Sequence, residues 1–262
     1  MSEFANKLQN LSNIISKPYL IIIFPIGLIG NIFNTIIFSR HSLRLNSCSL
    51  YFLSISFFHI IVLIIGCLFR LINLFLGYDL SSTSLIFCKF RAYIVVVGYV
   101  ISRHLLCLIS IDRWMITSTN IFIHRQCNRK TTQLIIIISI ILWFLIEIFI
   151  PIGFYIENNN CIPSLNPFYL FMYRIIDLLF IIFILLNLPA ASYSLYSYIT
   201  RMNIKTINHL AIDSFLNAIV SNLAYTHCAL TFYLYTMTSK KFRKECYLIY
   251  FYIQRRLINR FQ

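Results

Sequence analysis

Long, continuous apolar runs separated by short polar segments dominate the chain. The runs cover residues 18–39, 48–69, 90–112, 131–153, 168–199 and 210–237. A helix needs roughly 20 mostly apolar residues to cross the hydrocarbon core of a bilayer, whereas strands of a membrane barrel alternate over segments of about ten. Because these runs do not alternate, the pattern predicts an all-α integral membrane protein with six spanning helices.

The polar segments divide the chain into three parts. Residues 1–17 form a short N-terminal tail, residues 18–237 the helix bundle, and residues 238–262 a basic tail in which aromatic residues are interleaved, as in an amphipathic helix on an anionic membrane surface. The triplet Asn10-Leu11-Ser12 is a glycosylation sequon, so Asn10 is a candidate acceptor if the N-terminus lies outside the cell.

Composition supports a membrane environment. Of the 262 residues, 59% are hydrophobic and 11% are charged, where an ordinary globular domain has about 25% charged residues. The net charge of +14 would favour nucleic-acid binding in a soluble protein. Here the basic residues lie mainly between apolar runs, so we expect a lipid membrane as partner, no nucleic acid, no metal and no cofactor.

Basic residues predict the orientation and expose a conflict. Lys and Arg are more frequent in the first, third and fifth loops, which places these loops in the cytoplasm and the N-terminus outside. The last run has Arg201 and Lys205 before it and seven basic residues after it. Both of its flanks therefore favour the cytoplasm. An N-terminus outside and a C-terminus in the cytoplasm require an odd number of spans, so the six apolar runs are one span short.

Several residues together resemble the rhodopsin-like G-protein-coupled receptors. The match rests on their order and spacing, because no single one is specific. The matching residues are Gly30-Asn31 in the first run, Cys88 and Cys161, Asp112-Arg113-Trp114 at the end of the third run, Trp143 in the fourth, Pro189 in the fifth, and Tyr235 with Phe242-Arg243 after it.

The resemblance lacks one helix at the position where the basic flanks of the last run also indicate a missing span. The chain passes from Pro189 almost directly into the run that resembles the seventh helix of the family, and its only tryptophans are Trp114 and Trp143. The sixth helix, with its Cys-Trp-x-Pro motif, is thus absent, and the resemblance implies a rhodopsin-like bundle with six spans instead of seven. A skipped exon, a gene-model error and a true deletion all stay open as origins.

The resemblance also implies roles for single residues. Cys88 and Cys161 would form the outer disulfide, and Asp112 would hold Arg113 in an ion pair until activation, with Trp114 and Tyr235 as further parts of the coupling switch. Two departures matter. His59 replaces the acidic residue that binds sodium in the family, so no sodium site is expected. The family's Asn-Pro-x-x-Tyr motif reads Thr231 to Tyr235 here, without the proline.

Ionisable residues inside apolar runs are costly and often functional. Arg174 and Asp177 share a helix face at i and i+3, where a ligand contact and a structural ion pair are equally good explanations. Glu147 is expected to pack between helices, and Arg103 has no partner that the sequence identifies. Cys246, in the basic tail, is a candidate for palmitoylation, although an unmodified thiol explains it equally well.

The resemblance implies a plasma-membrane receptor that binds an extracellular ligand and signals to a heterotrimeric G protein, and the basic tail favours a cytoplasmic C-terminus. The charged outer positions favour a peptide ligand. Without the helix whose outward swing opens the G-protein cavity, this form is expected to signal poorly. An enzyme is not expected, since hydrolase and metalloprotease motifs are lacking. A six-span channel or transporter is the alternative, weakened by the absence of a glycine-rich filter loop and of repeats.

Overall fold

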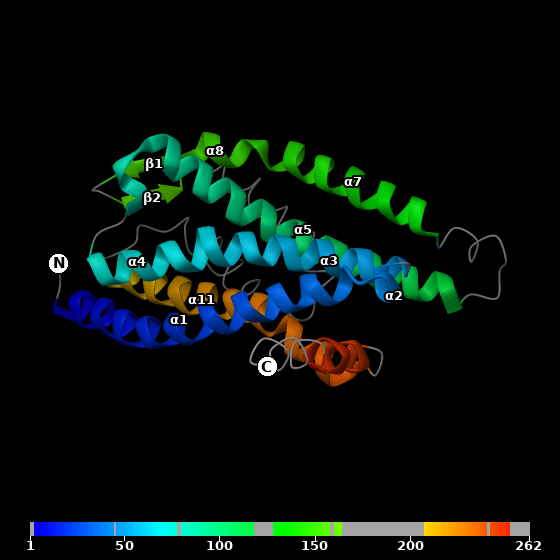
Figure 1. Cartoon of the computed structure of the whole chain (residues 1–262). Coiled ribbons are helices and arrows are strands. Elements are labelled where there is room, and N and C mark those ends of the chain that lie inside the picture. The colour runs from blue at the N-terminus through cyan, green and yellow to red at the C-terminus, as the bar shows by residue number, and fades with distance from the viewer. Residues whose placement is uncertain are drawn as a thin grey trace.

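The computed structural model describes residues 3–44, 46–77, 80–117, 128–157, 160–163, 207–239 and 242–251. The predicted run over residues 168–199, with Arg174, Asp177 and Pro189, lies outside the described residues. Within them the fold is helical except for one β-hairpin (Figure 1). The prediction of an essentially all-α chain is confirmed for this part.

The first helix, α1 (Glu3–Phe38), is longer than the sequence predicted. Its 36 residues span about 54 Å at roughly 1.5 Å per residue. The segment 1–17 was expected to be a tail, yet the helix begins at Glu3, where an acidic side chain suits the helix N-terminus and the Glu3 carboxylate pairs with Lys7 at 2.7 Å. No strong helix breaker precedes Pro18, so the helix continues from the polar segment into the apolar one.

The second apolar run forms a long helix whose middle part is a π-helix, and a short helix precedes it. The elements are α2 (His41–Arg44), α3 (Ser47–Ile61), the π-helix η1 (Val62–Leu68) and α4 (Phe69–Leu76). Gly77 follows with φ 77°, a left-handed conformation that only glycine adopts without strain, and its N–H bonds to the Asn73 carbonyl at 2.9 Å. The glycine thus ends the helix.

The third and fourth runs form long helices joined to a hairpin. The elements are η2 (Leu80–Thr83), α5 (Leu85–Thr117), α7 (Arg129–Ile146), η3 (Glu147–Phe149), α8 (Ile150–Gly153), β1 (Phe154–Glu157) and β2 (Asn160–Pro163). Asn128 caps α7, since its side-chain oxygen accepts a hydrogen bond from the Thr131 N–H at 2.9 Å. The antiparallel strands place Ile156 opposite Cys161.

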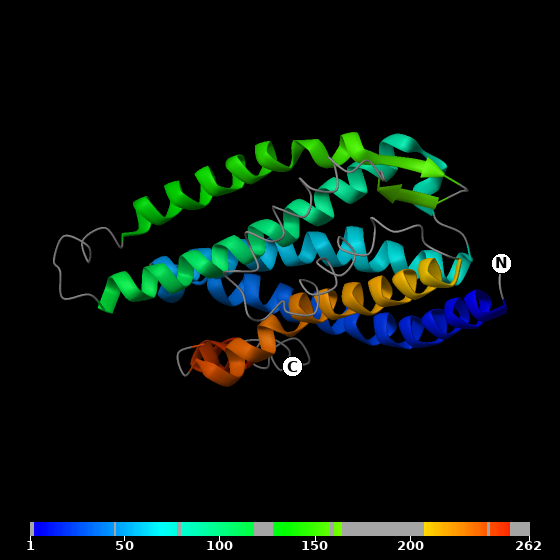
Figure 2. The same cartoon turned by 180° about the vertical axis from the view of Figure 1, so that it is seen from behind.

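The last run forms α11 (Ile207–Thr238), and a further helix covers residues 242–251. Helix α11 lies along α1 and runs parallel to it: Ser16 contacts Asn222, Asn31 contacts Cys228, and Phe38 contacts Tyr235 (Figure 2). The end of α11 therefore lies beside the end of α1, and the start of both helices lies at the hairpin end of the molecule (Figure 1).

Four described helices are long and apolar enough to cross a membrane, namely Glu3–Phe38, Ser47–Leu76, Leu85–Ile116 and Arg129–Gly153. They correspond to the first four predicted spans and indicate a helical membrane protein. The sixth predicted span is a helix, α11, but it is not one of these four. Its Asn, Thr, Ser and His residues make it more polar, and Asn222, Thr226 and Thr231 contact polar side chains of other helices.

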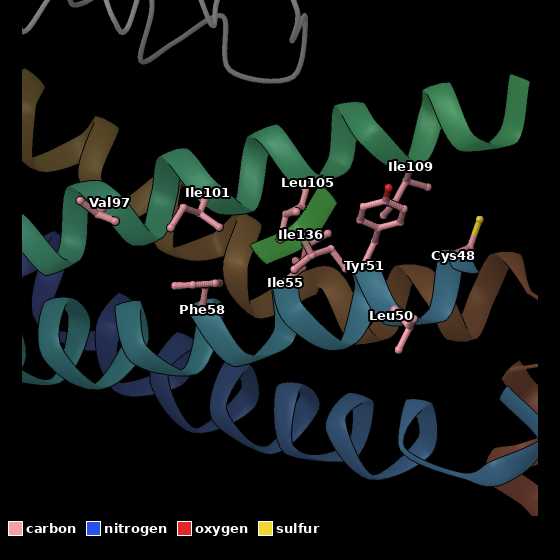
Figure 3. Packing of buried hydrophobic residues seen from close by; sticks show 10 residues of the cluster. All are labelled: Cys48, Leu50, Tyr51, Ile55, Phe58, Val97, Ile101, Leu105, Ile109 and Ile136. Carbon is pink, nitrogen blue, oxygen red and sulfur yellow. The ribbon is translucent and has the colours of Figure 1, made fainter. Parts of the chain in front are cut away.

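The largest cluster of buried side chains joins α3, α5 and α7. Phe58, Ile55 and Tyr51 of α3 face Ile101 and Leu105 of α5 (Figure 3). Their spacing of three and four residues is the pattern of one helix face packed on another. This cluster fixes α5 against α3, and with it both ends of α5, where the candidate site residues lie.

Candidate functional site

The start of α5 is joined covalently to the hairpin. A disulfide links Cys88, which is fully buried, to Cys161 of β2, with the two Cα atoms 5.7 Å apart. These are the two cysteines whose pairing the resemblance implied. Because α8 leads directly into β1, the bond also ties the end of the fourth apolar run to the start of the third.

Asp112 lies near the opposite end of α5 and points into the bundle. It continues the buried stripe of Ile101, Leu105 and Ile109, and is only 6% exposed. Its Oδ2 accepts hydrogen bonds from the Ser47 hydroxyl at 3.1 Å and the Cys48 thiol at 3.0 Å, both at the start of α3. The carboxylate therefore anchors the end of α5 to α3.

Arg113 and Trp114 lie on the outer side of the same helix turn. Arg113 is exposed, and the Trp114 side chain is 63% exposed. Successive residues are about 100° apart around a helix, so a buried Asp112 turns the next two residues outward. The ion pair predicted between Asp112 and Arg113 stays a prediction. The arrangement presents a cation and an indole at the end surface of the bundle.

Tyr235 closes the same end of the bundle. Its ring packs at 4.3 Å from Phe52, 5.8 Å from Phe38 and 6.2 Å from Phe242, measured between ring centroids. Its hydroxyl is buried and has no hydrogen-bond partner within the described part of the chain. Helix α11 continues past it to Thr238, with no proline in the helix.

The helix over residues 242–251 is fastened at its start. The Arg243 guanidinium donates to the carbonyls of Thr236 at 3.2 Å and Met237 at 2.6 Å, which satisfies two of the last carbonyls of α11. Glu245 lies 3.4 Å from the guanidinium of Arg40, in the turn after α1. These contacts hold the basic tail at the end of the bundle where Arg113 is exposed.

Cys246 lies on this helix and is half-buried beside Phe242 and Ile249. Burial, and then the neighbouring Glu245 carboxylate, raise the pKa of the Cys246 thiol. The thiol is therefore neutral at pH 7 and a weak nucleophile without an enzyme to activate it. Its palmitoylation stays a prediction.

A polar cluster lies inside the bundle, between α1, α3 and α11. His59 is fully buried, with Nδ1 at 3.2 Å from the Thr231 hydroxyl and its ring 5.7 Å from the ring of His227. Asn31 donates to the carbonyls of Gly27 and Cys228, each at 2.8 Å. Imidazole and amide groups thus occupy the position at which the resemblance implied an acidic residue in the family.

Some residues of this interior were not predicted. Asn222 donates to the Ser16 hydroxyl at 3.0 Å, Tyr19 contacts Thr226, and Asn34 is fully buried. The signal was present in the sequence: Ser12, Ser16, Asn31 and Asn34 fall on one face of a single helix. Small and polar residues at such spacing are typical of contacts between membrane helices.

The contact between α5 and α7 contains Trp143. Its ring meets the His104 ring edge-on, 5.7 Å between centroids, and His104 Nε2 lies 3.3 Å from the Ser139 hydroxyl. Glu147, at the end of α7, is 1% exposed, in line with a packing position. Arg103, whose partner could not be predicted from the sequence, lies over the Tyr99 ring at 5.6 Å.

The remaining predicted site residues are not part of the clusters described above. Asn10 is exposed in the N-terminal part of α1. Arg174, Asp177 and Pro189 lie outside the described residues. Among the described residues, no group of three or more His, Cys, Asp or Glu side chains is arranged to hold a metal ion.

Comparison with known protein families gives no match for this chain, and comparison with curated proteins gives none either. The functional interpretation therefore depends on the geometry above.

The two buried asparagines of α1 give a matched test of the polar interior. Asn31→Ala removes two hydrogen bonds and should cost about 1 kcal/mol, the usual range for hydrogen bonds between membrane helices. Asn34→Ala should cost less, because neither amide atom of Asn34 has a partner in the described part of the chain. Thermal unfolding of both variants in lipid nanodiscs measures the difference, and an equal or larger loss for Asn34→Ala would contradict it.

Proposed function

We propose that the chain is a membrane receptor of the rhodopsin-like type, with six spans instead of seven. It binds an extracellular ligand, a peptide being the favoured class, at the end that contains the disulfide. It acts on a heterotrimeric G protein at the end that contains Arg113. In this proposal the protein lies in the plasma membrane, with its N-terminus outside and its basic tail in the cytoplasm.

The two-ended anchoring of α5 is the observation that carries the proposal. A disulfide holds the start of α5 to the hairpin, and the buried carboxylate of Asp112 holds its end to α3. The hydrogen bonds at Ser47 and Cys48 are reversible, whereas the disulfide is not. A movement at the disulfide end of α5 can therefore release the hydrogen bonds of Asp112, which lie about 36 Å away along the helix.

Basic residues at the Arg113 end support the proposed orientation. Arg40, Lys130, Arg243 and Lys244 lie on the loops and helix ends that meet there (Figure 1). Such an excess of Lys and Arg is typical of cytoplasmic loops. Because α11 runs parallel to α1, the basic tail leaves the bundle at this end as well.

The missing sixth helix limits what this form does. In the family that the chain resembles, the sixth helix swings outward to open the G-protein cavity. We therefore propose that the 262-residue form binds a G protein weakly and does not accelerate nucleotide exchange. Sequencing of the native transcript across the codons for Lys205 to Asn208 separates a true six-span form from an incomplete one. An extra apolar segment of about 20 residues there would make the protein an ordinary seven-span receptor.

Binding to a G protein tests the proposal directly. The chain is reconstituted in lipid nanodiscs and incubated with nucleotide-free heterotrimers of each major α-subunit class. We expect retention of at least one heterotrimer, which Arg113→Ala abolishes because it removes the exposed cation at the end of α5. Lys130→Ala is the matched control, since it removes an exposed cation at the same end and should leave binding intact.

Two results would contradict the receptor function. One is binding that is equal in the wild type, Arg113→Ala and Lys130→Ala, which would mark unspecific attraction to a basic surface. The other is an ion or solute flux across liposomes that depends on the chain, which would favour the channel or transporter. Strong acceleration of nucleotide exchange by the 262-residue form would refute the proposed impairment alone.

A further inference from the structure

A regular apolar stripe runs along the whole of α1. Its members are separated by alternating steps of four and three residues: Phe4, Leu8, Leu11, Ile15, Pro18, Ile22, Pro25, Ile29, Ile32 and Ile36. All ten are apolar, and we call this set the α1 seam. Alternating steps of three and four are the a and d positions of a heptad repeat, the pattern by which helices pair in a coiled coil.

The α1 seam faces away from the rest of the described bundle. Nine of its members are exposed and Leu8 is half-buried. The opposite face of the helix carries the buried residues, among them Ser16, Leu20, Gly27 and Asn31, which face α11 and η1. Helix α1 lies at the edge of the bundle in both overall views (Figures 1 and 2). The seam is therefore open to a partner.

Lipid alone does not account for the outer part of the seam. A hydrocarbon core of about 30 Å takes about 20 residues of α1, from Phe38 back to Pro18. The part before Pro18 is rich in Asn, Ser, Gln and Lys and lies beyond the core. In it, Phe4, Leu11 and Ile15 are still 43–46% exposed. Lipid accepts any apolar face, whereas a heptad continued into a polar environment indicates a helix as the partner.

A second copy of the chain fits the seam best. All copies insert into the membrane with the same orientation, so two α1 helices meet parallel and in register, each seam residue opposite its equivalent. The a positions after Leu8 are Ile15, Ile22, Ile29 and Ile36, and Leu11 lies at a d position. β-branched residues at a with Leu at d favour two strands. No charge lies in the seam, and Lys7 beside it is paired with Glu3 of its own helix. Nothing along the seam repels an identical helix.

We propose that two copies of the chain form a symmetric dimer in which their α1 helices pair along the α1 seam as a parallel two-stranded coiled coil. The contact begins in the part of α1 outside the hydrocarbon core and continues through the membrane. It uses none of the residues assigned to ligand or G-protein contacts, so the dimer and the proposed function succeed or fail separately.

Cysteine cross-linking distinguishes the seam from the rest of the helix. Leu11→Cys and Ile15→Cys introduce thiols at a d and an a position, and Asn6→Cys and Asn13→Cys introduce them at f positions of the same outer segment. Each variant is oxidised in reconstituted membranes and separated on a non-reducing gel beside the wild type, whose native cysteines set the background. We expect several-fold more covalent dimer from the two seam variants than from the two controls.

All four positions lie outside the hydrocarbon core, and Leu11 and Ile15 are exposed, so folding should be retained. Equal yields from seam and control variants, or seam yields at the wild-type background, would overturn the proposal. Single-molecule photobleaching in liposomes at low protein density gives a second readout. Two steps per spot are expected for the wild type, and single steps would show that only lipid covers the seam.

Discussion

Gly27→Leu is expected to abolish the packing of α1 on α11. A Cβ atom at Gly27 would lie 2.7 Å from the Ala229 Cβ, 2.9 Å from the Ala229 Cα and 2.9 Å from Leu63 Cδ1. Two of these atoms cannot rotate away, so a larger side chain must push the helices apart. Even Gly27→Ala should cost about 1–3 kcal/mol by overpacking, and the leucine variant should not yield monodisperse protein in size-exclusion chromatography.

A reciprocal exchange identifies the contact responsible. Ala229→Gly removes the Cβ that meets position 27, so Gly27→Ala combined with Ala229→Gly should recover part of the thermal stability lost by Gly27→Ala alone. Ile29→Leu serves as a control on the same helix, because Ile29 is 52% exposed and faces away from α11. Wild-type elution and melting of Gly27→Leu would show that the two helices are not in this contact.

Cys88→Ser is expected to cause the second large loss of stability. The disulfide closes a loop between residues 73 positions apart, and removal of a native disulfide typically costs 2–5 kcal/mol, here expected to be about 4 kcal/mol. The variant loses the covalent bond between α5 and the hairpin, and a single thiol at Cys161 does not replace it. Unfolding by heat in nanodiscs, followed by circular dichroism, measures the change.

The control for this prediction is on the same helix. Cys107 is a free, half-buried cysteine of α5, and Cys107→Ser should change stability little. The double variant Cys88→Ser with Cys161→Ser should be no less stable than Cys88→Ser, since both remove one bond. Additive losses from the two cysteines would contradict the pairing.

Much of the local structure follows from the sequence because a helix is held together by contacts within four residues. The apolar runs predicted four of the described helices and the place of α11. The N-terminal segment differs from the prediction: its polarity predicts a tail, but helix α1 begins at Glu3. The helix includes the polar segment because Glu3 pairs with Lys7 and no helix breaker precedes Pro18. In that segment the α1 seam is recognisable in the sequence only as apolar residues at alternating steps of three and four.

The candidate site was predictable in its parts and not in its contacts. Periodicity on α5 predicts that Asp112 is buried and Arg113 exposed, whereas the ion pair between them stays a prediction. The sequence does not predict that Asp112 accepts hydrogen bonds from Ser47 and Cys48, because those residues are more than 60 positions away in the chain. The same holds for the pairing of His59 with Thr231 and the fastening of Glu245 to Arg40.

The sequence by itself determined that this is a helical membrane protein, where its long helices lie, and which face of α1 is apolar. These properties depend on local hydrogen bonding and on the transfer of side chains out of water, which a short stretch of chain decides. Only the tertiary structure decided that α1 and α11 run parallel, that Asp112 is held by α3, and that the α1 seam faces away from the described helices. Such contacts join residues far apart in the chain, and their geometry depends on the packing of all the helices at once.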